Sequence, residues 1–159
     1  LGFYLLSKNR LSLAGIPIGL AFAVKQSAWL ILPFYVAFIF FKKKNLLKTV
    51  KNLYLFTLTF LLILSPFLLW DYRPFLDSTV FYLSGSDPNS YPISGYGFGK
   101  LLNQAGVIKD IHQYFPFHIF QFVIGIPLVY FLISYLRKKP NVSRLILTYG
   151  LFLFVFWLA

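Results

Sequence analysis

The chain contains no cysteine and no methionine, and its only acidic residues are four aspartates. Without cysteine it has neither a disulfide framework nor a thiolate metal site, and its redox compartment stays undetermined. Charged residues make up only 12% of the 159 residues, whereas hydrophobic residues make up 58% and aromatic residues 21%. This composition is too apolar for an ordinary soluble domain. It predicts an integral membrane protein.

The charges are divided by sign along the chain. Lys and Arg number 15 and give a net charge of +11, and eleven of them lie in three short polar gaps, at 7–10, 42–52 and 137–144. The four acids lie elsewhere, within 71–115, and are Asp71, Asp77, Asp87 and Asp110. Short loops rich in Lys and Arg stay on the cytoplasmic side of a membrane. The basic gaps are therefore predicted to be cytoplasmic and loop 71–115 extracytoplasmic. A nucleic-acid partner is not expected, because the basic residues sit where apolar runs end.

Apolar runs predict a polytopic helical protein, because a helix that crosses the hydrocarbon core needs about 20 apolar residues. The predicted spans are 11–24, 27–41, 53–70, 116–136 and 145–159. The first two are interpreted as a pair of short helices that turns at Lys25-Gln26, since one long helix would bury Lys25 in hydrocarbon at a cost of roughly 3 kcal/mol. The apolar first and last residues, with no Met, are expected of a fragment of a longer polytopic protein.

The loop 71–115 is much longer than a connector needs to be, and long loops in compact proteins are usually functional. Pro74 is expected to open a short helix that lies flat at the membrane interface. The following turn-rich stretch carries Tyr91 and Tyr96, whose rings suit stacking on a sugar or seating at the lipid headgroups. Lys100 ends a glycine-rich run that lacks the Walker spacing, so it predicts a generic phosphate contact, with a plain turn as the alternative.

Asp71 is the candidate catalytic residue, because it follows Trp70 at the predicted outer end of a span. A carboxylate there can accept a proton, orient a sugar hydroxyl or bind a divalent metal. Alternatively, it caps the Pro74 helix and pairs with Arg73. Lys25 and Gln26 form the other polar site, where a lone cation can meet a lipid-linked phosphate or extend to ordinary headgroups. No cofactor is required by the sequence, and its scattered aspartates are compatible with a divalent metal without defining a site.

Two segments resemble the bacterial GT-C type glycosyltransferases, polytopic enzymes that use polyprenyl-phosphate sugars. The first is the sequence from Ala14 to Ala28, AGIPIGLAFAVKQSA, with Leu32-Pro33-Phe34 after it, which is similar to the paired short helices of that family. The second combines PFLLWD, which ends at Asp71, with YPISGYG, which begins at Tyr91. The resemblance covers Ser7 to about Phe120.

The resemblance implies an all-α GT-C-like bundle in the cytoplasmic membrane, with short interfacial helices in the extracytoplasmic loop. It also implies sugar transfer from a polyprenyl-phosphate donor to a lipid or glycan acceptor on that side. The family's catalytic carboxylate is typically in the first outer loop, which does not correspond to any segment here, so no catalytic residue is carried over. In the implied mechanism a carboxylate accepts the acceptor's proton, and cations such as Lys25, Arg73, and Lys100 hold the departing phosphate.

Three other classes remain open. A transporter or flippase would also have kinked spans and an outer loop, although ionisable residues near the bilayer midplane would then be expected. A polymerase or ligase of surface polysaccharide would use a large outer loop, usually with several Arg residues, whereas this loop has only Arg73. A purely structural membrane subunit is the third.

Overall fold

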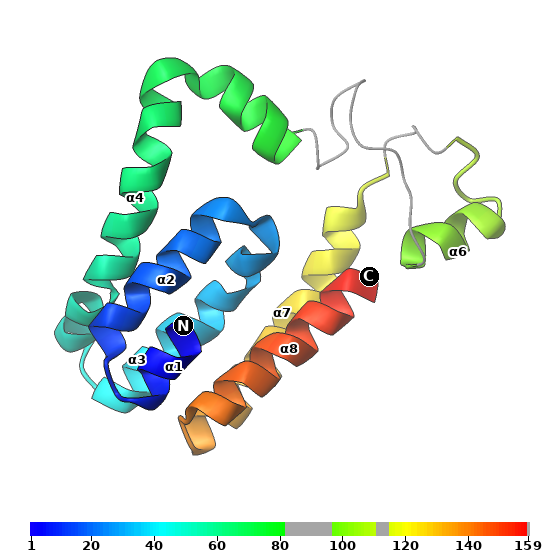
Figure 1. Ribbon diagram of the computed structural model, residues 1–159. Coiled ribbons are helices and arrows are strands. Elements are labelled where there is room, and N and C mark those ends of the chain that lie inside the picture. The colour runs from blue at the N-terminus through cyan, green and yellow to red at the C-terminus, as the bar shows by residue number, and fades with distance from the viewer. Residues whose placement is uncertain (82–96, 111–114, 159) are drawn as a thin grey trace. The chain divides into compact units, whose positions relative to one another are not determined.

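The computed structural model describes residues 1–81, 97–110 and 115–158, and these are helical with no strand among them. Figure 1 shows the helices in chain order. The all-α prediction is confirmed for this part of the chain. The elements are α1 (Gly2–Ser7), α2 (Leu11–Val24), the 3-10 helix η1 (Gln26–Ile31), α3 (Leu32–Lys43), α4 (Leu46–Leu76), the π-helix η2 (Asp77–Phe81), α6 (Phe98–Gln104), α7 (Phe117–Lys138) and α8 (Val142–Leu158).

The chain divides into two compact units, and each is described by itself. The first comprises Leu1–Pro66 with Pro127–Leu153, and the second comprises Phe67–Ile126 with Phe154–Ala159. Both long helices cross the division next to a proline, α4 at Pro66 and α7 at Pro127. Proline inside a helix removes one backbone hydrogen bond, so each of these helices is weakened where it crosses the division.

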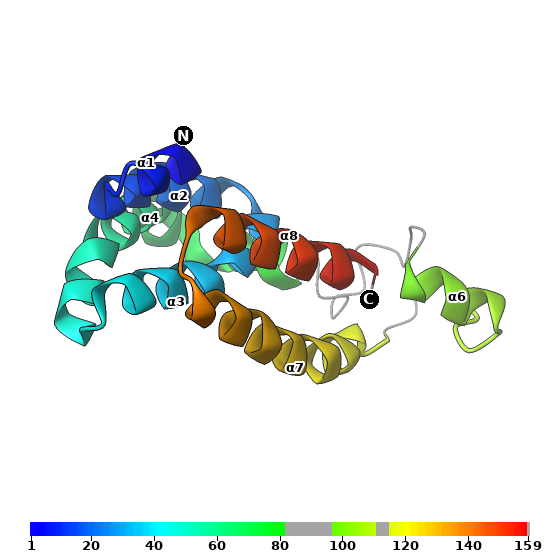
Figure 2. The same ribbon diagram turned by 90° about the horizontal axis from the view of Figure 1, so that it is seen from below.

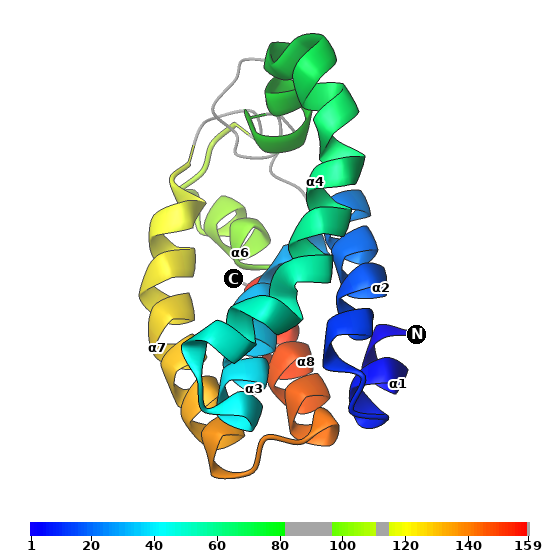
Figure 3. The ribbon, with the colours of Figure 1, turned by 90° about the vertical axis from the view of Figure 1, so that its left-hand side faces the viewer.

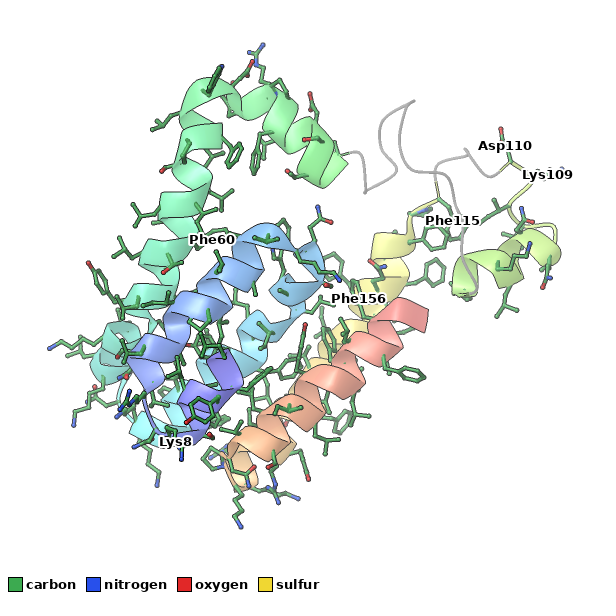
Figure 4. All side chains as sticks on the ribbon, viewed as in Figure 1. Lys8, Phe60, Lys109, Asp110, Phe115 and Phe156 are labelled. Atoms are coloured by element: carbon green, nitrogen blue, oxygen red, sulfur yellow. The ribbon has the colours of Figure 1, made fainter. Side chains whose placement is uncertain are left out.

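In the first unit, α2 packs closely on α4 through two glycines. A Cβ atom placed on Gly15 would lie 2.6 Å from the backbone N of Phe56, and one placed on Gly19 would lie 2.7 Å from the Phe56 carbonyl O. Two small residues four positions apart are typical of close helix approach, and here the backbone of α4 is what approaches. The ring of Phe22 follows on the same interface, with ring centroids 5.3 Å from Phe56 and 5.0 Å from Phe60, which Figure 4 labels on α4.

The core of this unit centres on α3. Phe34, Tyr35 and Phe38 are fully buried there. Phe34 meets Phe152 of α8 edge-on at 5.4 Å, and Tyr35 lies 5.8 Å from the ring of Phe56 on α4. The short helix α3 is thus enclosed by protein on several sides, and most of the exposed apolar surface lies on other helices.

The helices α7 and α8 form an antiparallel hairpin whose two arms lie side by side in Figures 1 and 2. Asn141 begins α8 as its cap, because its side-chain oxygen accepts from the N–H of Arg144 at 2.8 Å. The Arg144 guanidinium then closes the hairpin, donating to the Tyr135 carbonyl at 3.1 Å and lying 4.5 Å above the Tyr135 ring. Leu136 and Leu145 are fully buried next to this turn.

The lengths of the helices indicate which of the predicted spans are long enough to cross a membrane. Two helical stretches of the described residues are long and apolar enough to cross a membrane, Leu46–Thr79 and Ile119–Lys138, whereas Leu11–Val24 and Val142–Phe156 are shorter apolar helices. At 1.5 Å per residue α2 rises only about 21 Å, which is less than the ~30 Å hydrocarbon core. The expected pair of short helices is therefore present, and its first member does not cross a bilayer without tilt or local thinning.

Two predicted boundaries need correction. The helix predicted over 27–41 is a 3-10 helix up to Ile31, and its α-helical part is Leu32–Lys43. Pro33 in the first α-helical turn favours that start. The apolar run predicted from 53 belongs to a helix that already begins at Leu46, since the Asn45 side chain caps it by accepting from the N–H of Lys48 at 3.0 Å.

Candidate functional site at the kink of α4

A kink in α4 positions the candidate carboxylate. The backbone leaves the helical conformation at Asp71, where φ is -154° and ψ is 101°. The cause is Pro74, because a proline ring clashes with the carbonyl four residues earlier, here that of Trp70, and provides no N–H to bond it. Figure 1 shows α4 changing direction close to its C-terminal end. The helix predicted to open at Pro74 therefore begins earlier, at Tyr72, with Pro74 in its first turn.

Asp71 caps the helix that follows the kink. Its Oδ1 accepts a hydrogen bond from the backbone N–H of Arg73 at 3.2 Å, which is the contact of an N-cap residue. Phe67 and Phe75 stack across the kink with ring centroids 5.9 Å apart and brace it. The alternative interpretation of Asp71 combined a helix cap with an ion pair to Arg73, and of these two contacts the cap is observed. No ion pair with Arg73 is found among the described residues.

The Arg73 side chain lies along its neighbour Tyr72. Its Nε donates to the Tyr72 hydroxyl at 3.3 Å, and its guanidinium carbon lies 5.9 Å from the centre of that ring. Asp71, Tyr72 and Arg73 are all exposed, and the preceding Trp70 is 92% exposed. The end of α4 therefore presents one carboxylate, one guanidinium and two large aromatic rings on a single exposed turn.

The break after α2 presents the second predicted site. Lys25 has an extended backbone, with φ -136° and ψ 123°, and its side chain is exposed, whereas Gln26 is half-buried. The indole Nε1 of Trp29 donates to the Phe22 carbonyl at 2.8 Å. In a continuous helix that carbonyl would accept from the N–H of Gln26, so the indole replaces a backbone donor and stabilises the break. The predicted turn at Lys25-Gln26 is present.

A third segment contains Lys100. It lies exposed on α6, a helix of 7 residues whose N-cap is Gly97. An aromatic cluster holds α6 near the start of α7: Phe98 lies 5.4 Å from Phe120, and Phe120 stacks on Phe115 at 5.8 Å. Figure 4 labels Phe115, and Lys109 and Asp110 on the turn that follows α6. The candidate residues Tyr91 and Tyr96 lie outside the described residues.

The structure brings only some of the candidates together. Asp71 and Arg73 share the turn at the kink. Lys25 and Gln26 belong to the first unit, whereas Asp71, Arg73 and Lys100 belong to the second. In the part of the chain that the structure describes, no group of three His, Cys, Asp or Glu side chains gathers as a metal site.

Sequence reasoning missed two residues that shape the break at Lys25. Trp29 bonds the end of α2, as described above, and the Tyr149 hydroxyl of α8 donates to the Ser27 carbonyl at 3.2 Å. The sequence does contain a signal for the first contact, because a Trp seven residues after Phe22 is close enough for its indole N–H to reach back across a turn to the end of the helix. Nothing in the sequence connects Tyr149 to Ser27, because 122 residues separate them.

Comparisons of the chain with models of protein families, with curated proteins and with solved structures find no match in any of the three. A fold alone does not imply an activity.

Proposed function

We propose that this chain is part of a multi-pass glycosyltransferase of the cell membrane that transfers a sugar from a polyprenyl-phosphate donor on the extracytoplasmic side. The membrane assignment is supported by the exposure of the two long apolar helices. Only 6% of the most apolar window of Leu46–Thr79 and 11% of that of Ile119–Lys138 are buried. A core helix of a soluble protein would be mostly covered. Apolar surface of this extent is typical of contact with lipid or with partner helices.

The single observation that carries the enzymatic proposal is the geometry at the kink. The N-cap contact uses Oδ1 of Asp71 and ties the carboxylate to the helix that follows the kink. In the proposed reaction the other oxygen, Oδ2, accepts the proton of the acceptor hydroxyl as that hydroxyl attacks the sugar. The phosphate leaves with its negative charge, which Arg73 on the same turn is placed to neutralise.

The remaining candidates take supporting roles in this proposal. In the second unit, Lys100 contributes a further cation for the lipid-linked phosphate. In the first unit, Lys25 and Gln26 offer a cation and an amide as a separate contact for such a phosphate. Tyr91 and Tyr96 contribute aromatic rings that suit a sugar face. The resemblance of the segments around Lys25 and Asp71 to GT-C enzymes supports the choice of donor.

The capping role of Asp71 allows a test that separates chemistry from folding. Asn caps a helix about as well as Asp, but its amide cannot take up a proton. Asp71→Asn in the full-length protein should lose about 100-fold or more in sugar transfer with an unchanged melting temperature. Asp71→Ala should lose both activity and stability, the latter by about 1 kcal/mol.

Asp77→Asn is the matched control, since Asp77 is another exposed carboxylate in the same loop and its removal changes the charge equally. It should transfer sugar at the wild-type rate. Wild-type transfer by Asp71→Asn would remove Asp71 as the base. Equal losses in Asp71→Asn and Asp77→Asn would reduce its role to general loop charge.

The break after α2, at Lys25, favours a transporter or flippase as the second candidate. Transporter sites are commonly formed where a helix is interrupted and its neighbours supply the missing contacts, and here Trp29 and Tyr149 supply them. The two functions are distinguished in vesicles that contain the full-length protein and a labelled polyprenyl-phosphate sugar. Label that moves to the acceptor supports transfer, whereas label that crosses the bilayer unchanged supports translocation.

A further inference from the structure

Eleven of the twelve Lys and Arg residues of the first unit lie at one end of it, and Lys25 is the twelfth. Residues 1–66 and 127–153 contain no Asp and no Glu. The turns α1–α2, α3–α4 and α7–α8 lie at the same end of this unit in Figure 3. These turns and the helix ends beside them carry eleven cations, which are Lys8, Arg10, Lys42, Lys43, Lys44, Lys48, Lys51, Arg137, Lys138, Lys139 and Arg144. No carboxylate of the unit competes with an external anion there.

One of these turns has a defined backbone geometry. Asn9 adopts a left-handed conformation with φ 59° after the end of α1. Its N–H donates to the Leu6 carbonyl at 3.0 Å, and the N–H of Arg10 donates to the Leu5 carbonyl at 2.9 Å. These two bonds form a Schellman motif, which satisfies the carbonyls at the helix end. The motif fixes the backbone of Lys8 and Arg10 on either side of Asn9.

A pocket lies beside this turn. It is lined by Tyr4, Leu5, Lys8 and Arg10, is open to solvent and has a volume of about 310 Å³. A pocket of this size can admit a phosphate ester. Lys8 Nζ lies over the Tyr4 ring, 5.8 Å from its centre, and both side chains line the pocket. Figure 4 shows Lys8 at this end of the unit.

A third cation lies close to the pocket. Lys42 of α3 donates from Nζ to Asn9 Oδ1 at 3.4 Å, which links the α3–α4 turn to the α1–α2 turn. The same Lys42 Nζ lies 5.3 Å from the centre of the Phe38 ring. Cations from two separate turns therefore converge on one short stretch of backbone.

We propose that this pocket, which we call the Lys8–Arg10 pocket, binds a phosphate group. A guanidinium offers two parallel N–H donors that match phosphate oxygens, and an ammonium adds a compact charge beside it. The apolar Leu5 and the Tyr4 ring provide a wall for the uncharged part of an ester. Two sources share this chemistry, the headgroup of an anionic phospholipid and a free phosphate in solution. The inference does not depend on the proposed sugar transfer, which uses other residues.

The test compares two double variants of the full-length protein in zwitterionic nanodiscs to which fluorescent phosphatidylglycerol is added. Lys8→Gln with Arg10→Gln removes the two cations of the pocket. Lys48→Gln with Lys51→Gln removes the same charge from exposed positions of α4 that do not line the pocket. All four side chains are exposed, so folding should be retained, and the melting temperature checks this.

The pocket variant should bind phosphatidylglycerol about thirtyfold more weakly, because each cation next to an anionic headgroup contributes roughly fivefold. The control should lose less than about threefold, because Lys48 and Lys51 do not line the pocket and act on the headgroup only through a charge that salt screens. Equal losses in both variants, or wild-type binding by the pocket variant, would overturn the proposal.

Inorganic phosphate identifies the source of the ligand. Displacement of the lipid by inorganic phosphate, together with phosphate binding that the pocket variant loses, supports a soluble phosphate as the ligand. Failure of inorganic phosphate to compete, with the lipid affinity still dependent on Lys8 and Arg10, supports the phospholipid headgroup. Either result supports binding of a phosphate group in the Lys8–Arg10 pocket.

Discussion

Replacing Gly15 by alanine should destabilise the protein, although alanine is the better helix former. The new Cβ would lie 2.6 Å from the backbone N of Phe56 and 3.2 Å from its Cα. Backbone atoms cannot rotate out of the way as the end of a long side chain can. The helices α2 and α4 must therefore move apart by several tenths of an ångström.

The size of the expected loss of stability follows from two opposed effects, the strain of overpacking and the higher helix propensity of alanine. Overpacking of a tight interface costs about 1–3 kcal/mol, and a gap of 0.5–1 Å forfeits about a quarter to a half of each van der Waals contact. The contacts at risk include the rings of Phe22 and Phe60, whose centroids are 5.0 Å apart. Against this, Ala in place of Gly favours the helix by about 1 kcal/mol. The net loss should be about 1 kcal/mol and at most about 2 kcal/mol, which lowers the melting temperature by about 3 °C in a protein of this size.

Gly150 provides the matched control in α8, because a Cβ placed there would meet no atom within 4 Å among the described residues outside its own stretch of helix. Thermal unfolding of the full-length protein in detergent, followed by tryptophan fluorescence, should show a lower melting temperature for Gly15→Ala and an equal or higher one for Gly150→Ala. Gly19→Ala should resemble Gly15→Ala, since its Cβ would lie 2.7 Å from the Phe56 carbonyl O. Equal upward shifts for Gly15→Ala and Gly150→Ala would refute the close packing of α2 on α4.

Three further predictions concern the first unit and the membrane topology. Tyr35→Phe should leave the melting temperature unchanged or raise it, because the buried hydroxyl has no hydrogen-bond partner among the described residues. A clear drop would reveal a partner for that hydroxyl. Trp29→Phe should cost about 1–2 kcal/mol in thermal unfolding, since it removes the 2.8 Å bond to the Phe22 carbonyl; no change would mean that the indole does not hold the break. Single cysteines at Asp87 and at Lys43, introduced into this cysteine-free chain, should react with an impermeant thiol reagent from opposite sides of the membrane. Labelling of both from one side would contradict the proposed orientation.

Local sequence was sufficient for the positions of most helices. Long apolar runs bounded by basic or turn residues predict helices because neither hydrocarbon nor a protein core accepts an unpaired lysine. The same reasoning predicted the end of α2 at Val24, one residue before Lys25. It also foresaw that Asp71 could cap a helix, since a cap requires only a carboxylate and the N–H two or three residues later.

Contacts between distant residues could not be predicted in this way. The spacing of Gly15 and Gly19 indicates close packing but does not say against what, and the structure identifies the backbone of Phe56. Likewise, the charge of Lys8 and Arg10 was evident, whereas their pocket depends on the Schellman turn and on Lys42 reaching Asn9 from α3.

Composition and charge order by themselves determined an all-helical, strongly apolar chain with its cations and its aspartates in separate segments. Only the tertiary structure decided which helices touch, how the break at Lys25 is held and where Asp71 directs one of its oxygens. The physical reason is that helix formation and lipid preference depend on neighbours a few residues apart. Packing and hydrogen bonding depend instead on side chains brought together from far along the chain, as when Tyr149 bonds the carbonyl of Ser27.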